Sequence, residues 1–226
     1  MLATIHVIDF EGNRTHGILE YGLVTLKNLT ITEISTASCC KNLNHPTAYF
    51  GEHSRFSSNE KDKNFEHYLP FFIKKRSEGL FCAHGSSLED RLLRQYCPTP
   101  GAIDPLPKQR TSKNIQEILF QENIVSQFQG SIPTVTKLQR SISWGPWIDT
   151  YKIYRRYYPA AECYEVAELI RHFGLEKKLA NLAKKHNFAK TLTFHRAPYD
   201  ALATALLLQN FINHFQIKDI HFLLDH

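Results

Sequence analysis

The chain has 226 residues, of which 42% are hydrophobic and 22% are charged. These values exclude the disordered and fibrous classes, and a chain of this length most simply forms a single domain over residues 1–226. Lysine and arginine outnumber aspartate and glutamate by 27 to 22. The resulting formal charge of +5 is compatible with a polyanionic partner without indicating one.

The sequence shows no signal for export or membrane insertion. Its opening stretch, MLATIHVIDFEGN, has no basic leader, and no later stretch is long and apolar enough to span a bilayer. The five cysteines form neither a CxxC pair nor a zinc-binding spacing, so we predict reduced thiols. We therefore expect a cytoplasmic protein that has no membrane partner.

The pattern of apolar residues predicts strands early in the chain and helices later. Three strands come first, and the turn between the second and third is so short that these two must be antiparallel neighbours. The expected strands are 3–10, 17–26, 30–38 and two short ones near 80 and 146. The expected helices are 65–78, 86–96, one after the strand near 146, a pair hinged at Gly174, and 198–215. This order indicates an α/β fold with helices packed on a mixed sheet.

An insertion at about 98–143 interrupts this pattern. It is rich in proline and contains one helical pattern, NIQEILFQENIVSQF. A long insertion inside a compact domain is often a lid or a binding loop, and a surface elaboration explains it equally well.

Three acidic positions could carry chemistry, and the first lies at the end of the first expected strand. Asp9 and Glu11 are two residues apart, so strand alternation places both carboxylates on one face. Like charges this close repel unless a cation lies between them, and hard divalent cations prefer oxygen ligands. The pair is a candidate metal site, and a solvated strand end is the alternative.

The second position follows the strand near 80, in the stretch CAHGSSLEDRLLRQY. Glu89 and Asp90 lie in the first turn of the expected helix, where the helix dipole favours acids whether or not they do chemistry. Adjacent helical residues diverge by about 100°, so one of the two acids can point to a given site.

The third position is the start of the last helix, in TFHRAPYDALATALLLQNF. Pro198 is predicted to fix the helix start, which places Asp200 in the first turn and His195 in the loop before it. Alanines recur every four residues from Ala197 and make a narrow face that would let the helix lie close to the sheet. Histidine is the side chain best able to take a proton near neutral pH, although a histidine before a helix often has a structural role.

Together and in this order, the three positions resemble the motifs of the DEDDh 3′–5′ exonucleases, a DnaQ-like family that includes the proofreading epsilon subunit of bacterial DNA polymerase III. VIDFEGN resembles the first motif, D-x-E on the first strand. FCAHGSSLEDRLL resembles the second motif, A-H-N-x-x-F-D-x-x-x-L, and HRAPYDALATALLL resembles the third, H-x-x-x-x-D-A-x-A-T. The resemblance covers nearly the whole chain apart from the insertion. It implies a ribonuclease H-like three-layer fold, in which helices flank a mixed five-stranded sheet.

The resemblance also implies a site and a reaction. Four acids would hold two Mg²⁺ or Mn²⁺ ions about 3.5–4 Å apart, namely Asp9, Glu11, Glu89 and Asp200. His195 would be the general base, with Glu11 as a second catalytic residue. Three residues would bind the substrate, namely Phe10, Gly12 and His84. The reaction would be hydrolysis of the terminal phosphodiester of DNA, with single-stranded ends favoured, to release nucleoside 5′-monophosphates. A proofreading role would need a polymerase or repair partner, because the chain contains no polymerase domain.

The sequence departs from the family pattern at two positions. Glu89 stands where the family usually has aspartate, and Asp90 is an alternative ligand one residue later. Gly12 replaces the threonine that commonly follows D-x-E, which removes the side chain that usually contacts the terminal nucleotide. Arg196 occupies the position where a sister group has tyrosine, so that group is disfavoured.

Two other functions stay open. An exoribonuclease would act on RNA 3′ ends, and a catalytically inert module of the same fold would bind nucleic acid or a protein. The longer side chain of Glu89 favours the inert module, because a displacement of about 1 Å matters at a geometry-sensitive site. Aromatic and basic side chains could grip a single strand, although core roles suit the first two aromatics as well. The candidates are Trp147, Tyr151, Phe10, Arg155 and Arg156.

Overall fold

The computed structural model describes residues 4–13, 15–39, 64–97, 143–186 and 193–225. The expected insertion, with its helical pattern, lies outside the described residues apart from Ser143. The expectation of a single domain over the whole chain therefore stays a prediction.

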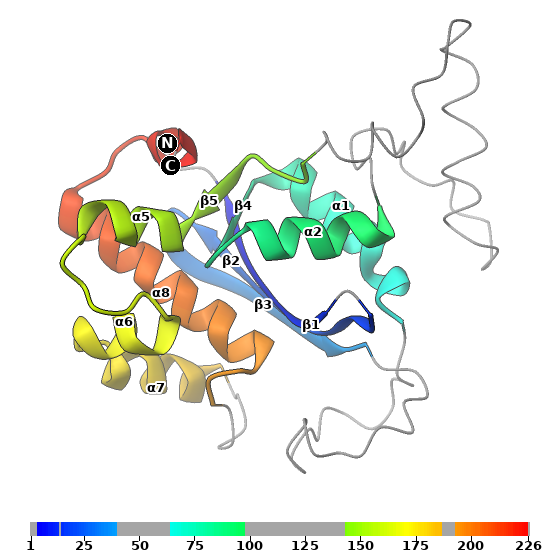
Figure 1. Ribbon diagram of the computed structural model, residues 1–226, viewed down its shortest axis with the longest axis horizontal. Helices are drawn as coiled ribbons and strands as arrows, with labels where there is room; N and C mark the ends of the chain where they lie inside the picture. Colours follow the sequence, from blue (N-terminus) through cyan, green and yellow to red (C-terminus); the bar gives the residue numbers. More distant parts are fainter. Residues whose placement is uncertain (1–3, 14, 40–63, 98–142, 187–192, 226) are drawn as a thin grey trace, which may run out of the picture.

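A mixed five-stranded sheet forms the centre of the fold (Figure 1). Its order is β3-β2-β1-β4-β5, in which β1, β2 and β3 are antiparallel neighbours while β4 runs parallel to both β1 and β5. The strands are β1 (Ile5–Asn13), β2 (Gly17–Lys27), β3 (Thr30–Ser38), β4 (Leu80–Ala83) and β5 (Trp147–Asp149). This arrangement confirms the predicted α/β fold with a mixed five-stranded sheet.

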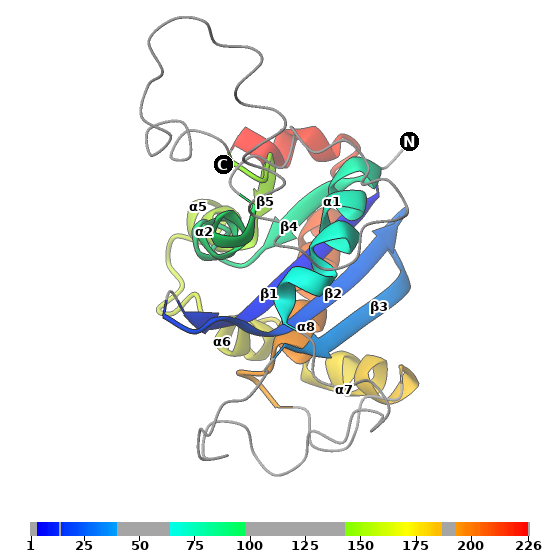
Figure 2. The same ribbon diagram turned by 90° about the vertical axis from the view of Figure 1, so that its right-hand side faces the viewer.

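Helices lie on both sides of the sheet and give the fold three layers (Figures 1 and 2). One side carries η1 (Phe65–Tyr68), α1 (Leu69–Glu78) and α2 (Ser87–Tyr96). The other side carries α5 (Thr150–Tyr157), α6 (Val166–His172), α7 (Glu176–Lys185) and α8 (Ala197–Phe215). A 3₁₀ helix, η3 (Ile220–Asp225), follows α8. Among these segments, no helix combines the length and the apolar composition that a bilayer crossing requires.

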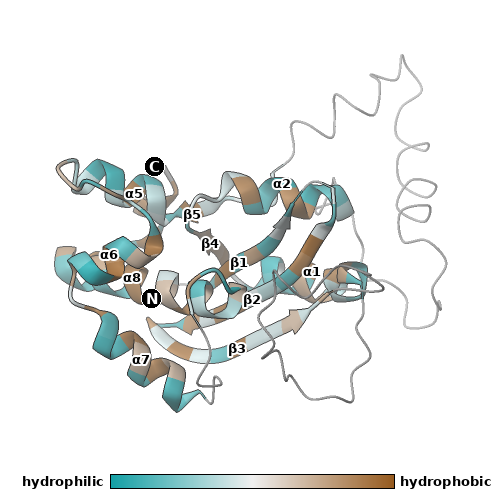
Figure 3. Ribbon diagram, turned by 60° about the horizontal axis from the view of Figure 1, so that its bottom comes forward, coloured by the Kyte–Doolittle hydropathy of each residue, from teal (hydrophilic) through white to brown (hydrophobic). Residues whose placement is uncertain are grey.

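Strand alternation divides the apolar side chains between two cores. Ile5 and Val7 of β1 are buried on the α8 side, whereas Ile8 and Phe10 are buried on the side of α1 and α2. Figure 3 shows hydrophilic and hydrophobic residues alternating along the covering helices, as expected where one side of a helix meets a sheet. Asp9 has the same parity as Ile5 and Val7, so its carboxylate points toward the side of α8.

Strand β1 continues three residues further than its apolar pattern indicates. We expected it to stop at Phe10 because glycine and asparagine follow, but it runs to Asn13 through a β-bulge between Glu11 and Gly12. A Cβ atom on Gly12 would lie 2.1 Å from the carbonyl oxygen of Gly17, so only glycine permits this close pairing. The extension keeps Glu11 within the paired strand.

Helix α8 lies close against β2 where both elements have little side chain. A Cβ atom on Gly22 would lie 2.3 Å from the carbonyl oxygen of Ala197 and 2.5 Å from the Cα of Pro198. Ala201 and Ala205 are fully buried behind this contact, so the predicted alanine face packs on the sheet. The start of α8 is therefore fixed by a glycine on the facing strand.

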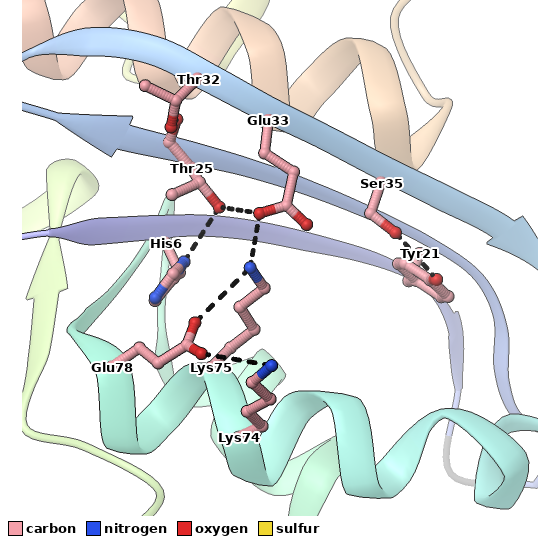
Figure 4. A network of polar contacts seen from close by, with 9 residues as sticks. All are labelled: His6, Tyr21, Thr25, Thr32, Glu33, Ser35, Lys74, Lys75 and Glu78. Carbon is pink, nitrogen blue, oxygen red and sulfur yellow. Dashed lines mark hydrogen bonds and ion pairs between the residues drawn. The ribbon is translucent and has the colours of Figure 1, made fainter.

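A polar network joins the sheet to α1 on the side away from Asp9 (Figure 4). The Lys75 ammonium lies 2.5 Å from Oε2 of Glu33 and 3.7 Å from Oε2 of Glu78. The Thr25 hydroxyl lies 3.1 Å from Nδ1 of His6. Burial lowers the pKa of His6 to about 4, so this ring is neutral at physiological pH. The network anchors α1 to the first three strands.

Replacing Gly22 by alanine is expected to push the start of α8 away from β2, because the new methyl group overlaps the backbone of Ala197 and Pro198. Overpacking of this kind typically lowers the free energy of unfolding by about 1–3 kcal/mol. Urea unfolding followed by circular dichroism measures the loss. Lys27→Ala, at an exposed position of the same strand, is the control and should change stability by less than about 0.5 kcal/mol. Equal stability of both variants would contradict the fixed position of the helix.

Candidate active site

Three carboxylates from two elements meet on the α8 side of the sheet. Asp9 and Glu11 project from β1 and Asp200 from the first turn of α8, and each offers a carboxylate oxygen within 4.8 Å of the other two. The strand register explains the meeting, because Asp9 pairs with Gly22, over which α8 begins. The carboxylates of the first and third sequence motifs thus lie together, whereas Glu89 and Asp90 of the second motif are not among the grouped residues.

The loop before α8 holds Asp200. The backbone amide of His195 donates to Oδ2 of Asp200 at 2.8 Å. His195 has a φ of 68°, a left-handed conformation that is uncommon for a residue other than glycine. The residue is exposed. Burial raises the pKa of Asp200 to about 7, and the amide of His195 and the nearby His195 ring oppose that rise.

The two neighbouring acids of α2, Glu89 and Asp90, have different surroundings. Both carboxylate oxygens of Asp90 bind partners within the protein. Its Oδ1 accepts hydrogen bonds from the Trp144 amide at 2.6 Å, the Ser143 hydroxyl at 2.8 Å and the Trp147 indole at 3.1 Å. Its Oδ2 lies 2.5 Å from the Arg94 guanidinium. Asp90 therefore joins α2 to the segment that leads into β5.

Glu89 is the acid of α2 that remains available to the cluster. Its Oε2 is buried and has no hydrogen-bond partner among the described residues. Burial raises the pKa of Glu89 to about 8. Burial also raises the pKa of Asp9 well above its ordinary value, and the charges of Asp200 and Glu89 add to that rise. Glu89 thus lies within electrostatic range of Asp9 and Glu11, although its oxygens are not among those within 4.8 Å of one another.

Asp149, which sequence reasoning missed, fixes the start of α2. Its carboxylate accepts hydrogen bonds from the amides of Gly85 and Ser86, both at 3.1 Å, and from the Ser86 hydroxyl at 2.9 Å. It also caps α5 by accepting from the Lys152 amide at 3.3 Å. Aspartate between a strand and a helix is a typical N-cap, so the cap of α5 could have been predicted. The hydrogen bonds from Gly85 and Ser86 to Asp149 could not.

Glu20 is the second residue that sequence reasoning missed. It pairs with Glu11 across the β1–β2 ladder and is almost completely buried. Its Oε2 accepts from Nε of Arg196 at 3.0 Å and from the Ala197 amide at 3.1 Å, and its Oε1 accepts from Nη2 of Arg196 at 2.6 Å. A glutamate inside an otherwise apolar strand, GILEYGLVTL, was the available signal.

His84 uses both ring nitrogens within the protein. Nε2 donates to the carbonyl oxygen of Tyr164 at 2.6 Å, which leaves Nδ1 to accept from the Thr150 hydroxyl at 2.9 Å. Burial lowers the pKa of His84, which favours this neutral form. The ring therefore joins the end of β4 to α5 and to the segment before α6. Its predicted contact with substrate stays a prediction.

The other two predicted substrate-binding residues lie on β1 without facing the carboxylates. Phe10 is 4% exposed, and its ring lies 5.6 Å from Phe65 and 5.5 Å from Phe72, between centroids, on the α1 side. Gly12 lies at the β-bulge against Gly17. Contacts from these two residues to a substrate stay predictions, and the backbone would have to provide them.

The candidates for gripping a strand have mixed surroundings. The Trp147 indole is committed to Asp90, which gives it a structural role. Arg155 is exposed and its guanidinium lies 5.6 Å from the centroid of the half-buried Tyr151 ring. Arg156 is exposed and lies over the ring of the residue that follows it. Tyr151, Arg155 and Arg156 of α5 are therefore still candidates for contact with nucleic acid, and that contact stays a prediction.

The chemistry of the cluster fits a divalent cation. Oε2 of Glu89 and Oδ1 of Asp200 are both buried without a hydrogen-bond donor in the described part of the chain, which is unfavourable for a carboxylate. Mutual repulsion adds to burial in raising the pKa of Asp9. A hard cation such as Mg²⁺ or Mn²⁺ would supply the missing partner for these oxygens and offset the repulsion.

The fold is shared with a known nuclease. A solved structure of exonuclease X in complex with 5′-overhanging duplex DNA is similar over 96% of this chain and 95% of its own, with 20% sequence identity and a TM-score of 0.53. No protein-family model matches the chain, and no curated protein sequence does. At this identity the similarity concerns the fold, which is the ribonuclease H-like arrangement that the sequence resemblance implied.

The two acids of α2 should respond differently to removal. Asp90→Ala leaves the buried Trp144 amide and the Arg94 charge without their partner, so the free energy of unfolding should fall by about 3–5 kcal/mol. Glu89→Ala removes a carboxylate whose Oε2 has no hydrogen-bond partner among the described residues, so it should instead weaken the rise in melting temperature expected with Mn²⁺. Thermal melts with EDTA and with Mn²⁺ measure both effects. If Asp90→Ala abolished the Mn²⁺ effect and Glu89→Ala kept it, Asp90 would be the ligand.

The raised pKa values predict how the metal-free protein responds to pH. In the folded state, carboxyl groups with pKa values of about 7 for Asp200 and about 8 for Glu89 bind protons more tightly than in the unfolded chain. Stability is therefore present at low pH and is lost as pH rises through these values. Glu89→Gln removes the part of that loss that comes from Glu89. In EDTA it should therefore raise the melting temperature at pH 8, by roughly 2–4 °C for each kcal/mol of stability recovered, and leave it unchanged at pH 5. A lower melting temperature at pH 8 would contradict the raised pKa.

Proposed function

We propose that the protein is a metal-dependent 3′–5′ exonuclease that hydrolyses the terminal phosphodiester of DNA, with single-stranded ends favoured, and releases nucleoside 5′-monophosphates. The observation that carries this proposal is the meeting of Asp9, Glu11 and Asp200 at one point of an exonuclease-like fold. Exonuclease X was solved in complex with DNA, which supports DNA as the substrate class.

Four acids are proposed to hold two Mg²⁺ or Mn²⁺ ions, namely Asp9, Glu11, Glu89 and Asp200. When bound, such ions neutralise the phosphate and lower the pKa of a coordinated water. Glu89 is preferred over Asp90 as the ligand from α2, because its Oε2 is unpartnered while both oxygens of Asp90 are engaged. The charge of Glu89 also lies within electrostatic range of Asp9 on β1.

His195 is proposed as the general base. Its position is exposed, so a proton accepted from water can pass on to solvent. Its own backbone amide is tied to Asp200, so the base and a metal ligand move as one unit. Glu11 is assigned a catalytic role as well, because its carboxyl group lies within electrostatic range of the His195 ring.

Substrate contacts are proposed to come from the backbone at Phe10 and Gly12 and from the β4 end at His84. The Phe10 ring and both His84 nitrogens are already in use, so side-chain recognition of the terminal base must come from elsewhere. A proofreading role would need a polymerase or repair protein as partner.

The test is digestion of 5′-labelled and 3′-labelled DNA single strands, the matching RNA, and a duplex with a 5′ overhang, each with Mn²⁺, with Mg²⁺ and with EDTA. We expect the 5′-labelled DNA to shorten one nucleotide at a time with either metal and to remain intact in EDTA. His195→Gln should lower kcat by about 10²–10⁴-fold, the usual contribution of a general base. Glu33→Gln, which removes a carboxylate on the opposite side of the sheet, is the matched control and should keep full activity.

Three results would contradict the proposal in different ways. Nucleotide release that survived in an Asp9→Ala, Asp200→Ala double variant would remove the cluster from the chemistry. Faster digestion of RNA than of DNA would favour the exoribonuclease. Strand binding without cleavage under either metal would favour the inert binding module.

A further inference from the structure

We infer that the ion pair between Glu20 and Arg196 is a positioning device of the active site, which acts through His195 and Asp200 and contacts no substrate. The inference rests on the proposed function, because it assigns a role relative to the proposed base and metal ligand. Neither residue belongs to the predicted metal-binding or catalytic set.

Three consecutive residues, two in the loop before α8 and the first residue of α8, each donate hydrogen bonds that fix their position. The His195 amide donates to Asp200 at 2.8 Å, and the Arg196 side chain donates twice to Glu20. The Ala197 amide donates to the same glutamate at 3.1 Å. The loop therefore has one attachment inside α8 and two on β2, and these attachments together determine where His195 lies relative to β1.

Glu20 acts as the cap of α8 from a different element. Helix α8 has no side-chain cap of its own at Arg196, and the first amides of a helix need acceptors from outside. Glu20 supplies one for Ala197, and its negative charge is also favourable at the positive end of the helix dipole. Removing Glu20 therefore frees the helix start as well as the Arg196 side chain.

The pair is shielded from solvent and geometrically specific. The side chain of Glu20 is 2% exposed and that of Arg196 is 15% exposed. The guanidinium contacts both carboxylate oxygens, an arrangement that lysine cannot reproduce. Because both oxygens of Glu20 are occupied, this acid is committed to the loop, although it pairs with Glu11 in the ladder.

His195 needs such support because of its backbone conformation. A left-handed φ of 68° is unfavourable for a residue with a side chain and persists where neighbouring contacts enforce it. The contacts that flank it are those of Arg196, Ala197 and Asp200. Loss of the pair should let the His195 backbone relax, which would move the base and the Asp200 carboxylate together.

The experiment compares Glu20→Gln, Arg196→Lys, Arg196→Met and the Glu20→Gln, Arg196→Met double variant in the full chain. Glu33→Gln is the matched control, because it also removes an acid partner of a buried cation, on the other side of the sheet. We measure kcat and KM on 5′-labelled single-stranded DNA, unfolding by urea, Mn²⁺ binding by calorimetry, and hydrogen exchange at the amides of 195–197.

We expect kcat to fall about 10–100-fold in Arg196→Met, with KM within about threefold of the wild type, because small displacements of catalytic groups have large effects on rate. Arg196→Lys should recover part of kcat. The double variant should be no worse than the poorer single variant, since the two residues act as one unit. Exchange at His195 and Ala197 should become faster, and Glu33→Gln should lose stability without losing kcat.

Two outcomes would overturn the inference. One is an unchanged kcat and unchanged exchange at 195–197 in Arg196→Met. The other is a loss of kcat in Glu33→Gln that tracks its loss of stability in the same way, which would make the pair an ordinary stabilising contact. A wild-type protein without nuclease activity would refute the proposed function separately. In that case, exchange at 195–197 and Mn²⁺ affinity would still decide whether the pair positions the loop.

Discussion

The close approach of α8 to β2 across Gly22 is the constraint on which the site depends. A side chain at that position would overlap the backbone of Ala197 and Pro198, so the helix can begin directly over the rung where Asp9 pairs with Gly22. Asp200 follows within the first turn of the helix. Two motifs almost 200 residues apart in the chain therefore meet because one strand position carries no side chain.

This proximity has an electrostatic consequence that the rest of the fold must offset. Burial and mutual repulsion raise the pKa of Asp9 well above its ordinary value, and the pKa values of Asp200 and Glu89 rise to about 7 and about 8. Without a cation, burial and repulsion therefore disfavour the ionised form of these carboxyl groups, which is the form that would bind a divalent cation. Two apolar cores, one on each side of the sheet, stabilise the arrangement, as expected where a functional site departs from the optimum for stability.

Local patterns in the sequence were sufficient for the parts of the fold that short-range rules govern. Alternation along β1 placed Asp9 and Glu11 on one face, and Pro198 located the start of α8 to within one residue. The contact between Glu20 and Arg196 could not be derived, because 176 residues separate them and many pairings of opposite charge are equally compatible with the composition. The choice between neighbouring acids on α2 also depended on which elements lie beside each one, and only the packing of the tryptophans around β5 decides that.

The hydrogen bonds divide the buried acids of this site into two kinds. Glu20 and Asp149 each accept several donors, including backbone amides at or just before the start of a helix, so their charges are satisfied by the protein. Glu89 and Asp200 each keep a buried oxygen that has no donor among the described residues. Glu20 fixes the start of α8 and Asp149 fixes the start of α2. These two helices approach β1 from opposite sides of the sheet, and they carry Asp200 and Glu89. Acids whose oxygens accept hydrogen bonds from the protein therefore position the acids that keep a buried oxygen without a donor, and this arrangement lets several carboxylates lie close together in a chain with a net positive charge.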